Sequence, residues 1–178
     1  GANCYIGKNV KIGNNTMVLP NTCIFGKTVI GSNSVIKSNT TIGSEGFGFS
    51  FTGDEFFHFP HLGTIKIGNH VWIGSNCTIE KSQLEQTIIE DHVKIDDLVQ
   101  IGHNSIIKKL SQITAGSVVC GRAQIGKRCW LAPNSVISDG CKIGDNCFVG
   151  TLSLVNKDFP KNSVLVGTPA KFLRKVKF

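Results

Sequence analysis

Residues 94–121 read KIDDLVQIGHNSIIKKLSQITAGSVVCG, and this stretch contains the clearest repeat in the chain. Aliphatic residues recur in it every six positions. They are Ile95, Ile101, Ile107, Ile113 and Val119. An amphipathic helix repeats its apolar face every three or four residues, and a half-buried strand every two. A constant block of six is typical of the hexapeptide repeat of a parallel β-helix, in which each short strand is followed by a corner.

The same block extends over most of the 178 residues, in three runs with 22 aliphatic positions. The runs extend from Ile6 to Ile42, from Ile67 to Ile79, and from Ile89 to Val155. Three blocks close one coil of triangular cross-section, so we expect one all-β domain of about seven coils over residues 1–160. The spacing does not set the handedness, although the general rule for parallel crossovers favours a right-handed path.

An inserted loop, residues 45–64, interrupts the repeat between Ile42 and Ile67, and a smaller insertion precedes Ile89. The long loop lies in the segment GSEGFGFSFTGDEFFHFPHLG and contains six phenylalanines. Their side chains need cover, and loops on a rigid scaffold commonly carry recognition. We therefore expect the loop to pack on a neighbouring chain, on a ligand, or on both.

After Val155 the repeat stops, and residues 161–178 are predicted to cap the solenoid. Their sequence predicts a strand, a turn at Gly167-Thr168-Pro169 and a short amphipathic helix from Ala170. Residues 157–178 also carry +5 of the formal net charge of +7. A compact basic end suits a small polyanion or an acidic protein surface, or it is a solvated tail. A nucleic-acid binder would more commonly spread its basic residues along one face, with aromatic residues between them, so we expect no nucleic-acid partner.

The seven cysteines follow the phase of the repeat. Four occupy a position where other blocks carry Ser, Thr, Val or Ala. They are Cys77, Cys129, Cys141 and Cys147. We expect small packing residues in a reducing compartment rather than disulfides or metal ligands. With no signal peptide and no run of 18 apolar residues, the sequence predicts a soluble cytoplasmic protein without membrane insertion.

His103 is the strongest candidate for chemistry among five histidines. It lies in the corner Gly102-His103-Asn104, directly after an aliphatic position, where an isolated histidine is usually only solvated. A zinc site built between stacked coils would need ligands 18 residues apart. Those positions hold Glu85 and Gly121, so we expect no metal.

Three segments together resemble the UDP-3-O-acylglucosamine N-acyltransferases of lipid A synthesis: GSEGFGFSFTGDEFFHFPHLG, IGNHVWIGSNCTIE and KIDDLVQIGHNSI. The resemblance covers residues 30 to 150 and implies a left-handed β-helix that assembles as a homotrimer. It also implies that His103 is the general base that takes a proton from a sugar amine as the amine attacks an acyl thioester. A histidine near its ordinary pKa suits that task. By the same resemblance, the Gly121 N–H stabilises the thioester oxyanion.

The resemblance extends to substrate binding. Glu45 occupies the position of a family aspartate, and the loop with Phe47 and Phe49 would close over the sugar. Asp96 and Asp97 lie at another corner, one block before His103, so an adjacent subunit would have to bring them to the site. There they would bind sugar hydroxyls or orient the imidazole; the alternative is a pair of solvated corner carboxylates.

The chain also departs from that family. A family histidine that contacts the donor's pantetheine arm has no equivalent near Ser138-Asp139-Gly140, and the uridine-binding domain has no counterpart in these residues. The ending VLVGTPAKFLRK instead resembles acetyl-CoA-dependent sugar acetyltransferases, which implies that Gly167, Lys171 and Arg174 hold the CoA phosphates.

The expected function is therefore transfer of an acetyl group from acetyl-CoA to the amine of a nucleotide-linked amino sugar, in the synthesis of a cell-envelope glycan. The alternatives are an acyl-carrier-protein-dependent N-acyltransferase of lipid A synthesis, a sugar O-acetyltransferase, and a catalytically silent β-helix scaffold. The basic C-terminal end suits an acidic carrier protein as well as CoA.

Overall fold

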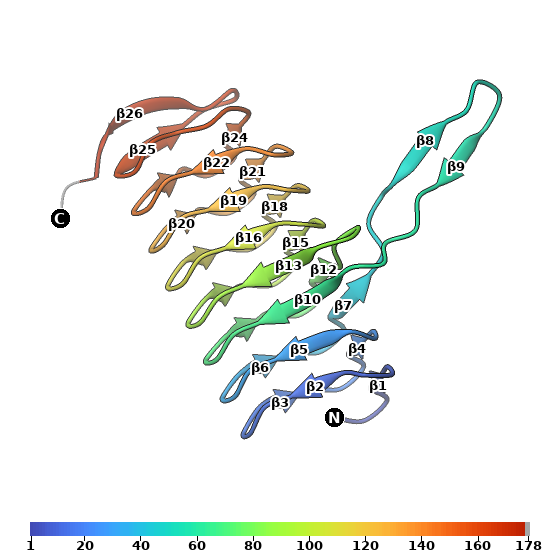
Figure 1. The fold of residues 1–178 in the computed structure, drawn as a ribbon. Helices are drawn as coiled ribbons and strands as arrows, with labels where there is room; N and C mark the ends of the chain where they lie inside the picture. The colour runs from blue at the N-terminus through green and yellow to red at the C-terminus, as the bar shows by residue number, and fades with distance from the viewer. Residues whose placement is uncertain (177–178) are drawn as a thin grey trace.

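The computed structural model describes residues 1–176, which form a β-solenoid of three parallel sheets with a projecting hairpin (Figure 1). The first sheet contains β1 (Tyr5–Ile6), β4 (Cys23–Ile24), β7 (Thr41–Ser44), β12 (Thr78–Glu80), β15 (Gln100–Ile101), β18 (Val118–Val119), β21 (Val136–Ile137) and β24 (Leu154–Val155). The second contains β2 (Lys11–Ile12), β5 (Thr28–Ile30), β10 (Thr64–Ile67), β13 (Gln86–Ile89), β16 (Ile106–Ile107), β19 (Gln124–Ile125) and β22 (Lys142–Ile143). The third contains β3 (Met17–Val18), β6 (Val35–Ile36), β11 (Trp72–Ile73), β14 (Lys94–Ile95), β17 (Gln112–Ile113), β20 (Trp130–Leu131), β23 (Phe148–Val149), β25 (Ser163–Val166) and β26 (Lys171–Lys175).

The aliphatic position of every block points into the centre of the solenoid. Equivalent residues pair in register between coils, as Ile79 does with Ile101, and Ile101 with Val119. These three side chains are fully buried. The six-residue prediction is therefore confirmed, with eight, seven and nine strands in the three sheets where about seven coils were expected. The 22 aliphatic blocks account for eight, seven and seven of these strands; the third sheet gains β25, which continues the parallel stack, and β26, which returns antiparallel to it.

Corners between the strands use residues that tolerate a left-handed backbone. Many corner residues have a positive φ, and most of these are asparagine, as at Asn104 with φ 59°. Buried hydroxyl groups satisfy corner carbonyls; the Ser111 hydroxyl, for example, donates to the Gly126 oxygen at 2.7 Å. The corners are thus rigid positions from which a side chain can be aimed outward.

The inserted loop forms an antiparallel hairpin of β8 (Phe49–Phe51) and β9 (Phe56–His58) that projects from the side of the solenoid (Figure 1). The coils continue beneath it, because β10 pairs directly with β5 and β12 with β7; the β12–β7 register shifts by one residue between Ile79 and Glu80, next to the loop. All six loop phenylalanines are exposed, and Phe47 is 87% exposed. A single chain therefore does not bury these phenylalanine side chains, and the expectation that a neighbouring chain or a ligand covers them remains a prediction.

The C-terminal helix predicted from Ala170 is wrong. Lys171–Lys175 form β26, which runs antiparallel to β25 and pairs Val164 with Arg174. A solenoid ends in an open sheet edge whose N–H and C=O groups need partners, and a returning strand supplies them where a helix would not. No helix occurs in residues 1–176, so none there is long and apolar enough to cross a bilayer. The last two residues of the predicted cap, 177–178, lie outside the described part.

The cysteines lie where the repeat predicts small packing residues. All seven are free thiols, and Cys77, Cys129, Cys141 and Cys147 are buried. Burial raises the pKa of the Cys77 thiol, which keeps it protonated and unreactive.

Candidate functional site

His103 lies at the corner between β15 and β16, and its neighbours set its tautomer. The ring Nδ1 lies 3.0 Å from Oδ1 of Asn104. That same oxygen accepts the backbone N–H of Gln83 at 3.1 Å, so it is an acceptor and Nδ1 carries the proton. The lone pair is therefore on Nε2, the atom that a general base needs. Asn104 was not among the expected site residues, although it is part of the QIGHN motif that singled out His103.

Gly121 lies one coil further on, directly against the free nitrogen of His103. A Cβ at this position would lie 2.7 Å from Nε2 and 2.9 Å from Cε1 of the imidazole, so only glycine leaves the ring in place. The structure thus brings the two expected catalytic residues together across adjacent coils.

The Gly121 N–H lacks the acceptor that equivalent N–H groups have. At two other corners, Ser75 donates to Asp97 Oδ1 at 2.7 Å and Lys127 donates to Asp145 Oδ1 at 2.8 Å. The matching carboxylate for Gly121 is Asp139, which forms an ion pair with Arg122 instead. No acceptor within the described residues takes the Gly121 N–H, which leaves this donor available to a ligand.

Two further side chains from the other side of the corner contact His103. Glu80 is buried, and its Oε2 accepts the backbone N–H of His103 at 3.2 Å. His61 packs edge-on against the His103 ring, with the ring centroids 5.2 Å apart. Burial, followed by the nearby His103, lowers the pKa of His61, so its neutral form is favoured. The spacing of the coils could not reveal these contacts, because both residues belong to inserted or irregular segments.

A pocket of about 430 Å³ opens beside His103. It is lined by Phe47, Gly48, Phe49, Ser50, Phe59, Gln83, His103, Arg122 and Asp139. The aromatic loop, with Phe47 and Phe49, and the coil corners thus line one cavity. Arg122 and Asp139 were not expected there; they form an ion pair in the cavity lining.

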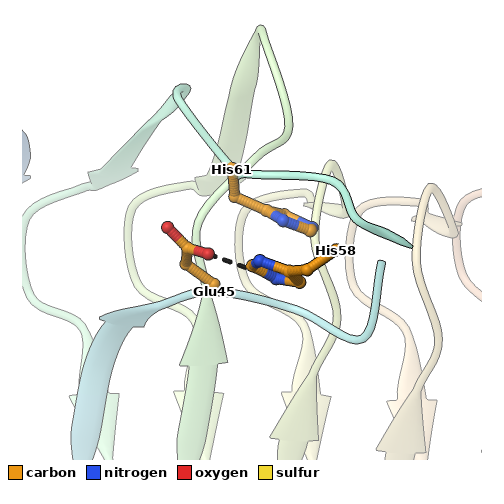
Figure 2. A group of neighbouring side chains, drawn as sticks. All are labelled: Glu45, His58 and His61. Carbon is orange, nitrogen blue, oxygen red and sulfur yellow. Dashed lines mark ion pairs between the residues drawn. The ribbon is translucent and has the colours of Figure 1, made fainter. Parts of the chain in front are cut away.

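Glu45 lies at the entry to the loop, beside the cavity rather than in its lining. One carboxylate oxygen lies 3.3 Å from Nζ of Lys81. The other lies 3.3 Å from Nε2 of His58 (Figure 2). Figure 2 also shows His61 next to this pair, so Glu45 is linked to the His103 region through the loop histidines.

Asp96 and Asp97 lie elsewhere, at the corner after β14 in the third sheet. Asp97 forms an ion pair with Lys37 at 2.7 Å and caps Ser75. Hydrogen bonds from Lys37 and then from Ser75 lower the pKa of the Asp97 carboxyl. Within one chain these carboxylates do not reach His103, and Asp97 supports the coil itself.

Gly167, Lys171 and Arg174 lie together at the C-terminal end of the solenoid. Gly167 forms a turn with φ 101°, a conformation that favours glycine, and Lys171 and Arg174 are exposed on β26. The Gly167 oxygen accepts the N–H of Leu154 in β24, a strand three places beyond β15 in the first sheet. In a single chain this basic turn is separate from the cavity beside His103.

A solenoid of six-residue blocks with a histidine aimed from one corner defines a hexapeptide-repeat protein. The family described as bacterial transferase hexapeptide (six repeats) matches residues 9–44 and 122–157. The chain therefore belongs to the hexapeptide-repeat family.

Several curated proteins that are similar to this chain share the same name. The UDP-3-O-acylglucosamine N-acyltransferase of Delftia acidovorans is 31% identical over 126 residues, which are 71% of this chain and 38% of that protein. The protein of the same name from Rickettsia akari is 51% identical over 85 residues, 48% of this chain and 25% of that protein. The chain thus spans about a quarter to two fifths of the length of these curated relatives.

Solved structures match almost the whole chain. LpxA from Acinetobacter baumannii superposes with a TM-score of 0.89 at 26% identity, covering 97% of this chain and 66% of that one. The UDP-N-acetylglucosamine acyltransferase of Francisella novicida gives 0.89 at 26% identity, covering 98% and 63%. The left-handed parallel β-helix implied by the family resemblance is confirmed by this match, against the right-handed path favoured by the general crossover rule.

Proposed function

We propose that this chain carries the acyl-transfer site of an acyltransferase of lipid A synthesis. It would move an acyl group from an acyl-carrier-protein thioester to the amine of a nucleotide-linked glucosamine. The observation that carries the proposal is the placement of Nε2 of His103 against Gly121, beside a cavity of about 430 Å³. The names of the curated relatives support the acceptor and the reaction class.

In this mechanism both substrates bind together and the acyl group moves directly between them. Nε2 of His103 takes a proton from the sugar amine as the nitrogen attacks the thioester carbonyl, a contribution of about 10²–10⁴-fold. The carbonyl oxygen becomes an oxyanion, which accepts a hydrogen bond from the Gly121 N–H. The intermediate then expels the carrier thiolate, which regains a proton from the His103 imidazolium. Asn104 keeps the ring in the tautomer that starts the cycle.

The surrounding residues supply binding. We assign Phe47 and Phe49 to the acceptor or its acyl chain, because they line the cavity and are otherwise exposed. Glu45 would contact the substrate or hold the loop in place. Asp96 and Asp97 would contribute only from an adjacent subunit of a homotrimer, in which the exposed loop would also find cover. The expected setting is the cytoplasm.

Acetyl-CoA is the second candidate donor, although the similarity to UDP-3-O-acylglucosamine N-acyltransferases favours the carrier protein. The exposed basic strand with Lys171 and Arg174 is what favours CoA. An acidic carrier protein would be attracted by the same positive charge. A hydroxyl acceptor is the remaining alternative, because one structural neighbour is named UDP-N-acetylglucosamine O-acyltransferase.

A transfer assay tests the proposal. The chain is incubated with a long-chain acyl carrier protein or acetyl-CoA, each with UDP-3-O-acylglucosamine or UDP-N-acetylglucosamine, and the products are identified by mass spectrometry. We expect an N-acyl product with the carrier protein only. His103→Ala should lower the rate by at least about 10²-fold, with unchanged melting temperature and donor binding.

The matched control is His92→Ala, which removes an exposed corner histidine from another corner and should leave the rate unchanged. A near wild-type rate in His103→Ala would refute the assignment of the base. A melting temperature that rises with acetyl-CoA and not with the carrier protein would move the proposal to the second donor. Absence of binding to either donor would favour the silent scaffold.

A further inference from the structure

A cluster of three potential metal ligands lies in the inserted loop, and one of them, His61, packs against His103. Glu45 precedes the hairpin, His58 ends β9, and His61 follows it; Figure 2 shows their side chains converging. Each offers one ligand atom, and these atoms all lie within 4.8 Å of one another. We propose that these three residues bind a divalent transition-metal ion of the zinc class, which fastens the loop beside the cavity.

His61 already has the arrangement of a metal-bound imidazole. Its Nδ1 lies 3.2 Å from the Phe59 carbonyl oxygen, which can only accept, so Nδ1 is the N–H donor. The lone pair therefore belongs to Nε2. That atom is buried in a side chain with 0% exposure and has no hydrogen-bond partner within the described residues. A metal-ligating histidine typically gives its other N–H to a backbone carbonyl in this way, which fixes the ring orientation.

Glu45 and His58 complete the donor set. Glu45 Oε2 lies 3.3 Å from His58 Nε2, so one metal ion can bind both atoms. The other oxygen, Oε1, lies 3.3 Å from Lys81 Nζ and keeps that ion pair. Two imidazole nitrogens and one carboxylate oxygen are typical ligands of Zn²⁺, with a fourth position left for water.

The cluster needs only a small contraction to bind an ion. Tetrahedral zinc with bonds of about 2.0–2.1 Å places its ligand atoms roughly 3.3 Å apart. The pair from Glu45 and His58 already has that separation, and His58 is exposed at the end of a strand, where its ring can rotate. His61 is the fixed member, because it is buried against His103.

This site differs from a zinc site built around His103 on stacked coils. A site on stacked coils would need ligands 18 residues from His103, and Glu85 and Gly121 occupy those positions. Here all three ligands come from one loop, so the regular spacing carries no information about them. Because the ion would join the entry of the loop to its exit, binding should order the whole hairpin.

Zinc titration of the whole 178-residue chain tests the inference, after chelator treatment and dialysis. Calorimetry should give one Zn²⁺ per chain, and Co²⁺ should give the visible absorption of a tetrahedral site. His58→Gln and Glu45→Gln should each weaken binding by at least about tenfold, since even loss of a second-shell partner costs 10–100-fold. Because both residues are on the surface, neither change should lower the melting temperature.

The control is a second histidine pair. His70 and His92 stack with ring centroids 4.7 Å apart on the exposed corners, and no third ligand in residues 1–176 completes a metal-binding group with them. His70→Gln and His92→Gln should leave zinc affinity unchanged. The inference is overturned if the wild-type chain binds no zinc, if these controls weaken binding as much as His58→Gln, or if Glu45→Gln binds like the wild type. His103→Ala should retain the ion, so a chain that binds zinc and transfers no acyl group would refute only the proposed function.

Discussion

Replacing Gly121 with alanine should lower the rate of acyl transfer without lowering the stability of the fold. The new Cβ would lie 2.7 Å from Nε2 of His103 and 3.0 Å from Oδ1 of Asp139. Ordinary contact distances are about 3.5–4.0 Å, so the imidazole must retreat by roughly 1 Å. It cannot do so freely, because Asn104 holds Nδ1 at 3.0 Å.

A 1 Å misplacement of a reacting group can cost about 10²-fold, which corresponds to about 2.7 kcal/mol of transition-state free energy. We therefore expect kcat/KM of Gly121→Ala to fall about 100-fold in the acyl-transfer assay. The free energy of unfolding should change little, because Gly121 is not among the glycines with positive φ. Calorimetric melting curves check the second expectation.

Gly140→Ala is the matched control with the opposite outcome. Gly140 has φ 70°, and a Cβ there would meet no atom within 4 Å. An alanine in this left-handed conformation should cost about 1 kcal/mol and lower the melting temperature by about 2–4 °C, with the rate unchanged. A wild-type rate in Gly121→Ala, or equal rate losses in both variants, would refute the role assigned to the contact with His103.

Two further predictions concern the scaffold. Ile101→Ala should destabilise the chain by about 2–5 kcal/mol, because it leaves a cavity in a fully buried ladder; Ile6→Ala, at the open end where the residue is 46% exposed, should cost much less in the same chemical denaturation experiment. Asp97→Asn should reduce the loss of stability in acid. The ionised Asp97 is favoured in the fold by Lys37 and Ser75, so its contribution is present above the unfolded pKa of about 3.9 and is lost as pH falls through the lower folded pKa. Melting temperatures between pH 6 and the acid range should decline less steeply in the variant than in the wild type, and parallel curves would contradict this account.

The repeat made the coils predictable because every block repeats the same physical requirement. An aliphatic side chain such as Ile101 must face the centre, and a corner must follow within a few residues. The pairing of His103 with Gly121 follows from the same geometry, since an 18-residue offset places two corners in adjacent coils. Residues on different corners, such as Asp97, could not be placed at the site by that rule.

The wrong prediction of a C-terminal helix and the missed contacts of His103 both depend on residues that are far apart in the sequence. Phe172 and Leu173 predict one face of a helix when read locally, but the open edge of β25 selects a strand. His61 contacts His103 only because the inserted loop folds back over the corner. The six-residue pattern of aliphatic positions contains no information about where an inserted loop folds back onto the coils.

The way the loop joins the solenoid has a consequence for how such proteins diversify. Its entry is fixed where Lys81 N–H donates to the Ser44 oxygen, and its exit where Gly63 N–H donates to the Ser82 oxygen. Both junctions therefore lie on two consecutive residues of a neighbouring coil, and closing a loop of different length between them would cost little additional entropy. Evolution or protein engineering can exchange the whole specificity element as one cassette while the coils, and the base that they aim, stay unchanged.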